Sequence, residues 1–362
     1  MSISLLALVT ELPQRLSQTR TEFDSLGLSQ LIIVTSLFLI WLMPLDFLGG
    51  FAFPRRFEKS KKSFRNWVQA YLVAATAQAL LFVLFGSLIV WTSQIYGRTG
   101  GLAAITISMI SCFVVRNRLL LRREFKSANS NEKLVNATAM IQSWQIFVPR
   151  TVVVEHTDIG FTGGIIGFGK RAQIVIPRAW LSLTREQLAT SIARRALAVS
   201  TGSYHRGLAI AFAWNLSGFL LCSFLPGASL ESVAGLVTTL CGFTLWSFLG
   251  LLTLPTISRN ACLTIDRSLS TKGVPLDLIS NTAHSIDQMQ DDEPDRPRWI
   301  ETIFHPVPNV SSRNPSNSVR GLEAWNVARS TLFLSWACLG FLSRSVHCNL
   351  GRPELWTMLP TD

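Results

Sequence analysis

Apolar residues run along this chain in long stretches rather than in short alternating patterns. The hydrocarbon core of a bilayer is about 30 Å thick, so a helix that crosses it needs about 20 mostly apolar residues. Five stretches approach this length: Leu31–Phe53, Ala70–Tyr96, Gly101–Val115, Leu208–Pro226 and Ser232–Ile257. A sixth and shorter run, Ser330–Ser343, fits either a span with polar ends or a buried helix. The pattern predicts a mainly α, polytopic membrane protein with five or six transmembrane helices.

Two more polar segments, 116–207 and 258–329, predict a small α+β domain that forms from both halves. The β-branched runs 151–156 and 172–177 flank a Gly-rich stretch, which is typical of a β-hairpin or a small meander. A helix should begin after Thr184, because Gln187 three residues later completes a capping box.

The composition agrees with a membrane protein, since 48% of the residues are hydrophobic and only 15% are charged. No recognised nucleic-acid-binding module accompanies the net charge of +11, so we expect no nucleic-acid partner. The basic residues instead crowd into 54–65 and 116–126, and such loops stay on the cytoplasmic side of a membrane. This places the N-terminus outside and 54–69, 116–207 and 258–329 inside.

Metal-binding and nucleophilic motifs are absent from the sequence. No two histidines are three or four residues apart, as two zinc ligands on one helix would be, and no G-x-S-x-G motif occurs. The histidines are His156, His205, His284, His305 and His347. Within the apolar stretches, Asp46 is the main candidate for a buried functional acid, although the nearby Pro44 equally suggests a bent helix end.

The order of elements from about 150 to 315 resembles the membrane-embedded zinc metallopeptidases of the HtpX and CAAX prenyl protease type. The stretch "IVIPRAWLSLTREQLATSIARRALA" is followed by two spans, then by "SRNACLTIDRSLSTKG", and later by "IFHPVPNVSSR". The helix opening 183–188 corresponds to the start of the family's zinc helix. Further positions that match the family are Ser258, Arg259, Asp266, His305, Pro306 and Arg313.

The chain departs from this family at the residues that hold the metal. The resemblance puts the first zinc histidine at Arg194, the catalytic glutamate at Arg195, the second histidine at Ala198 and the third ligand at Cys262. An arginine cannot lose its proton in a protein, so it can neither bind zinc nor act as a base. We therefore expect no catalytic residues, no zinc and no other cofactor.

We hypothesise that Arg194 or Arg195 occupies the vacated metal position and pairs with Asp266, because an unpaired buried carboxylate is costly. The alternative is that both arginines face solvent or lipid headgroups.

These expectations describe a pseudoprotease, an inactive metallopeptidase-like scaffold of a bacterial cytoplasmic membrane whose domain faces the cytoplasm. Its partners would be the bilayer and an extended protein segment bound at the hairpin 151–177. Two alternatives are an active peptidase with a rearranged metal site at Cys262, His205 or His305, and an unrelated membrane scaffold or transporter.

The sequence divides into seven expected segments. They are an N-terminal segment at 1–30, three spans in 31–115, half-domains at 116–207 and 258–329, a transmembrane hairpin at 208–257, the run 330–343 and a tail at 344–362.

Overall fold

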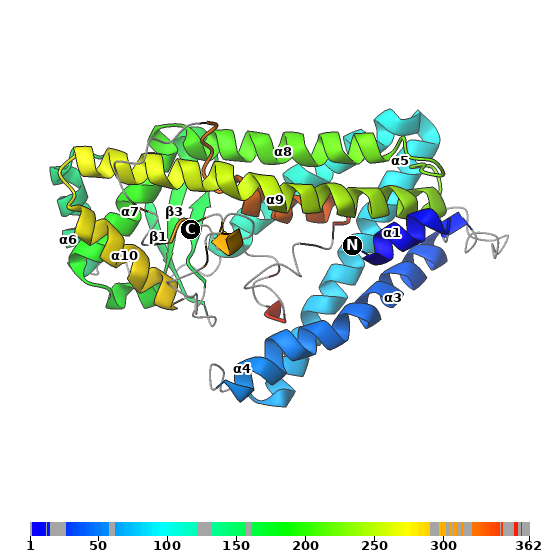
Figure 1. Ribbon diagram of the computed structural model, residues 1–362, viewed down its shortest axis with the longest axis horizontal. Coiled ribbons are helices and arrows are strands. Elements are labelled where there is room, and N and C mark those ends of the chain that lie inside the picture. Colours follow the sequence, from blue (N-terminus) through cyan, green and yellow to red (C-terminus); the bar gives the residue numbers. More distant parts are fainter. Residues whose placement is uncertain are drawn as a thin grey trace. The chain divides into compact units, whose positions relative to one another are not determined.

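The computed structural model shows a mainly helical protein with one small sheet (Figure 1). It describes residues 2–11, 13–14, 27–57, 62–121, 132–156, 161–289, 297, 299–301, 305, 307–309, 313, 321–340, 342, 351–353 and 356. The chain forms two compact units, and three of the boundaries between them fall inside the long helices α5 (Phe64–Leu121), α8 (Ser203–Cys222) and α9 (Val233–Thr271). The first, here called the helical unit, comprises 1–113, 212–249 and 332–357, and the second, the sheet unit, comprises 114–211, 250–331 and 358–362.

Three helices of the described chain are long and apolar enough to cross a membrane: Leu28–Arg56, Phe64–Leu119 and Val233–Thr271. The first includes α3 (Leu28–Phe47), a π-helical turn (Leu48–Ala52) and α4 (Phe53–Arg56). The second and third are α5 (Phe64–Leu121) and α9 (Val233–Thr271). Helices α1 (Ser2–Val9), α8 (Ser203–Cys222) and α12 (Val327–Leu334) also lie wholly or partly in the helical unit.

The backbone of α5 is interrupted at Gly97, whose φ of 63° and ψ of −154° are not helical. A residue with a side chain rarely adopts this conformation, so glycine is the natural break point. The interruption falls where the sequence predicts a short connection between the stretches 70–96 and 101–115.

The sixth apolar run is short and buried. It forms α12, of 8 residues, followed by the 3₁₀ turn Ser335–Cys338. Every residue from 331 to 340 is buried. An eight-residue helix is about 12 Å long, well short of the hydrocarbon core. These features favour the buried helix over the span.

The sheet has the strand order β1-β3-β2 and corrects the expected hairpin. Its strands are β1 (Thr151–Val154), β2 (Gly164–Ile166) and β3 (Gln173–Pro177). The two predicted strands, β1 and β3, run parallel, whereas β2 pairs antiparallel with β3. The Gly-rich stretch is therefore not only a turn: glycines with positive φ at 163 and 167 bracket a third strand.

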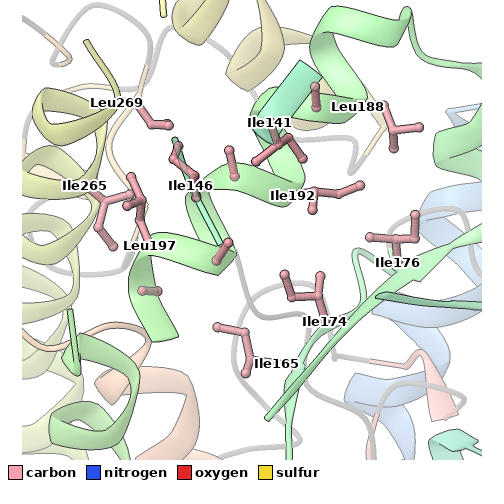
Figure 2. Packing of buried hydrophobic residues seen from close by; sticks show 14 of the residues in the cluster. Ile141, Ile146, Ile165, Ile174, Ile176, Leu188, Ile192, Leu197, Ile265 and Leu269 are labelled. Carbon is pink, nitrogen blue, oxygen red and sulfur yellow. The ribbon is translucent and has the colours of Figure 1, made fainter. Parts of the chain in front are cut away.

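Helix α7 (Arg185–Ser200) occupies the centre of the sheet unit. The predicted capping box is confirmed: the Thr184 hydroxyl accepts from the Gln187 backbone N–H, and the Gln187 side chain accepts from the Thr184 N–H. Helices α6 (Glu132–Ser143) and α10 (Leu276–Met289) both contact α7 (Figure 1). Figure 2 shows apolar side chains of α7, the sheet, α6 and α9 meeting in one core, which leaves α7 with no solvent-facing side between 188 and 198.

Candidate functional site: a buried arginine–aspartate centre

Two consecutive arginines of α7 lie inside the protein. Arg194 is 3% exposed and Arg195 is fully buried. This rules out the alternative in which both face solvent or headgroups. Neighbouring residues on a helix point about 100° apart, so the two guanidinium groups meet different surroundings.

Arg194 faces α9 and contacts Asp266. Its Nε donates a hydrogen bond of 2.7 Å to Asp266 Oδ1, and the side chains of both residues are buried. The second oxygen, Oδ2, accepts from Nη1 of Arg313 at 2.6 Å, and Arg313 is also buried. One carboxylate is thus held between two guanidinium groups that come from α7 and from the segment that follows α10.

Arg195 faces the sheet instead. Its Nη1 donates to the carbonyl of Val175 at 2.8 Å, and its Nη2 donates to the carbonyl of Thr162 at 2.7 Å. Both carbonyls lie at one end of the β2–β3 ladder, where Gly164 is the first residue of β2 and pairs with Val175. Arg195 therefore supplies N–H donors to two backbone carbonyls at this end of the sheet.

Two indole rings lie under these cations. The guanidinium carbon of Arg195 is 4.4 Å from the ring centre of Trp180, and that of Arg194 is 5.6 Å from the ring centre of Trp325. The face of an indole ring attracts a cation, and the attraction is stronger where water is excluded. The rings offset part of the cost of burying positive charge.

The other positions that the resemblance assigns to zinc binding lie in the apolar core. Ala198 is fully buried and Cys262 is 4% exposed, and both belong to the hydrophobic core of the sheet unit. A methyl group and a thiol thus occupy the positions that the resemblance assigns to the second histidine and the third ligand.

The remaining matched positions hold the backbone around α9. The Ser258 hydroxyl accepts from the Ala328 N–H at 3.2 Å. Arg259 donates to the carbonyl of His305 at 2.9 Å and also to that of Glu301. Arg313 fixes its own segment, since its Nε donates to the Pro308 carbonyl at 3.2 Å. Pro306 lies outside the described residues.

The alternative of a rearranged metal site names Cys262, His205 and His305 as ligands, and each of these residues packs against other parts of the protein. His205 Nε2 accepts from the Gly169 N–H at 2.9 Å, and its ring packs edge-on against Phe168. Cys262 is in the core, and His305 is 6% exposed. Within the described part of the chain, no three His, Cys, Asp or Glu side chains are grouped so that they could hold a metal ion.

Both edge strands of the sheet are covered, which bears on the expected strand-binding role. Val152–Val154 and Gly164–Ile166 are buried. At β2, the Tyr204 hydroxyl reaches the carbonyls of Ile165 and Gly167 at 3.4 and 3.1 Å. Burial raises the pKa of Tyr204, and the nearby Arg116 opposes this shift. An added strand would have to displace these contacts.

Asp46 lies in the helical unit, away from this centre along the chain, and is 1% exposed. Its Oδ1 accepts from the Gly351 N–H at 3.2 Å, and the Trp67 indole donates to the Gly351 carbonyl at 3.1 Å. Gly50 approaches Gly351 so closely that a Cβ on Gly50 would lie 2.0 Å from the Gly351 oxygen. These contacts place residue 351 of the tail against the α3–α5 turn.

Sequence reasoning missed several of these partners. Arg313 was matched only by the resemblance, and nothing in the sequence joined it to Asp266, 47 residues away. No sequence pattern indicated the other partners, because the sequence does not show which tryptophan or which backbone carbonyl lies beside an arginine. These partners are Trp180, Trp325 and the carbonyls of Val175 and Thr162. No known family model matches the chain, and no curated protein matches it.

Proposed function

We propose that this chain is a catalytically inactive, metallopeptidase-like membrane protein in which an arginine–aspartate–arginine centre replaces the zinc. The observation that carries the proposal is the Asp266 carboxylate held between Arg194 and Arg313. In the resemblance, Arg194 takes the position of a zinc histidine. A guanidinium there supplies positive charge beside Asp266 without supplying a ligand or a base.

The chemistry of the site favours binding over hydrolysis. Metal-assisted hydrolysis needs a metal-bound water and a group that accepts its proton. Arg195, at the position of the catalytic glutamate, is a permanent cation whose N–H groups already bind carbonyls of the sheet. These groups suit a binding scaffold better than a peptidase.

Elemental analysis tests the loss of zinc. The full-length protein in detergent, dialysed against a mild chelator, is expected to hold far less than one zinc per chain and to leave an unfolded test polypeptide intact, with or without added zinc. About one zinc per chain after dialysis would contradict the proposal, because structural and catalytic zinc sites bind stoichiometrically. Substitution of Cys262, His205 and His305 would then locate the ligands.

We further propose five membrane spans, with the sheet unit facing the cytoplasm of a bacterial cell. The basic stretches at 54–65 and 116–126 support this orientation. In a cysteine-depleted background, a membrane-impermeant thiol reagent should label Glu231→Cys in intact cells and should label Arg171→Cys only after the membrane is opened. Both positions are exposed, so accessibility within the protein does not decide the result. Labelling of Arg171→Cys in intact cells would indicate the opposite orientation, with the sheet unit outside.

A further inference from the structure

The turn between α3 and α5 exposes aromatic and basic side chains together. Phe53, Phe57 and Phe64 are 52%, 66% and 53% exposed. Arg55, Arg56 and Arg65 are exposed among them. We call these six residues the basic–aromatic turn. The sequence from Pro54 to Arg65 carries six basic residues and one acidic residue, so the positive charge is in excess.

Packing beneath the turn holds two of these side chains, Phe64 and Arg55, against the ring of Phe51. The ring of Phe51 lies 5.3 Å from that of Phe64 and 6.0 Å from that of Trp67, measured between centres. The Arg55 guanidinium lies 5.5 Å from the Phe51 ring centre. Trp67 is in turn tied to the Gly351 carbonyl. A surface that is ordered before binding loses less entropy when a ligand arrives.

The basic–aromatic turn joins two helices that are long and apolar enough to cross a membrane. In Figure 1, α4 lies at the end of the pair formed by α3 and the first part of α5. When such helices are inserted, the connection between them lies near the headgroups. Phenylalanine side chains at such a position bury into the boundary between the headgroups and the acyl chains, and clustered Lys and Arg residues attract anionic lipids there.

We propose that the basic–aromatic turn binds anionic phospholipids. The phenylalanine rings lie among the upper acyl chains, while Arg55, Arg56 and Arg65 donate hydrogen bonds to the headgroup phosphates. Arginine suits this role because its planar group presents two N–H donors to a phosphate at once. The inference rests on membrane insertion and is independent of the loss of zinc.

Lipid-binding measurements on the full-length protein test the proposal. In detergent micelles doped with phosphatidylglycerol or phosphatidylcholine, the wild type should bind phosphatidylglycerol more tightly, and the difference should shrink with added salt. Arg55→Gln with Arg56→Gln should weaken phosphatidylglycerol binding on the order of 30-fold and leave phosphatidylcholine binding nearly unchanged. Arg56→Gln with Arg65→Gln should act similarly while it preserves the Arg55–Phe51 contact.

Lys170→Gln with Arg171→Gln is the matched control, because this adjacent basic pair is also exposed and ends a short helical turn. The control should change binding less than about twofold, since its charges lie outside the turn. The proposal fails if both turn variants keep the wild-type preference or if the control loses as much. It also fails if inorganic phosphate at the same concentration displaces the lipid, which would indicate a site for free anions.

Discussion

The two sides of α7 bury one arginine each, by different means. On the side that faces α9, Arg194 shares the Asp266 carboxylate with Arg313. On the side that faces the sheet, Arg195 binds neutral carbonyls of Val175 and Thr162 and lies over Trp180. The first arrangement depends on opposite charge, and the second depends on hydrogen bonds and a ring. Adjacent and identical residues therefore need not have the same role or the same sensitivity to mutation.

The largest expected effect comes from removal of the shared carboxylate. Asp266→Ala leaves Arg194 and Arg313 close together without the charge between them, and we expect a loss of about 3–5 kcal/mol of unfolding free energy. Thermal or denaturant unfolding in detergent measures the loss. Asp277→Ala, a change to an exposed acid in the first turn of α10, is the control and should cost little. An Asp266→Ala protein as stable as the wild type would mean that the ion pair contributes nothing.

Replacement of Arg195 tests the other side of α7. Arg195→Met keeps the apolar part of the side chain but removes the two N–H donors that it gives to the Val175 and Thr162 carbonyls, which should cost about 2–4 kcal/mol. Arg195→Lys keeps the charge but cannot span both carbonyls, so it should recover only part of the loss. If lysine restores full stability, charge rather than hydrogen-bond geometry is what this position requires.

A double-mutant cycle separates the two sides directly. Arg194→Met and Asp266→Asn should be non-additive by about 1–3 kcal/mol, because the two groups are in contact. Arg195→Met and Asp266→Asn should be additive within about 0.5 kcal/mol, since Arg195 binds the sheet. An equal coupling energy in both cycles would contradict the conclusion that Arg194 pairs with Asp266 while Arg195 binds the sheet.

The smallest effect is expected at the exposed start of α7. The backbone N–H of Glu186 holds the pKa of that carboxyl below its usual value, with a further contribution from Arg185. A carboxyl whose pKa is lower in the folded than in the unfolded state stabilises the protein at pH values above its unfolded-state pKa. This stabilisation is lost as the pH falls through its folded-state pKa. The wild type should therefore exceed Glu186→Gln slightly in melting temperature at pH 7, and the difference should vanish in acid. A difference that persists below both pKa values would point to packing instead.

Local sequence patterns predicted where helices and strands form better than they predicted how the strands pair. The start of α7 at Thr184 follows from a capping box that needs only four residues. The break at Gly97 follows from backbone freedom at one residue. The hairpin was wrong because the sequence of a strand does not record whether its neighbour runs parallel or antiparallel. The three residues of β2 were too few to form a visible pattern.

The sequence by itself determined the apolar helices, the excess of basic residues and the absence of the usual zinc ligands at the positions of the resemblance. These properties depend on residue type and spacing, which can be read along the chain. Only the tertiary structure decided that Arg194 meets Asp266, that Arg313 completes the centre and that Arg195 serves the sheet. These contacts join residues 20 to 72 positions apart. Their formation depends on how α7, α9 and the sheet pack, which no local pattern encodes.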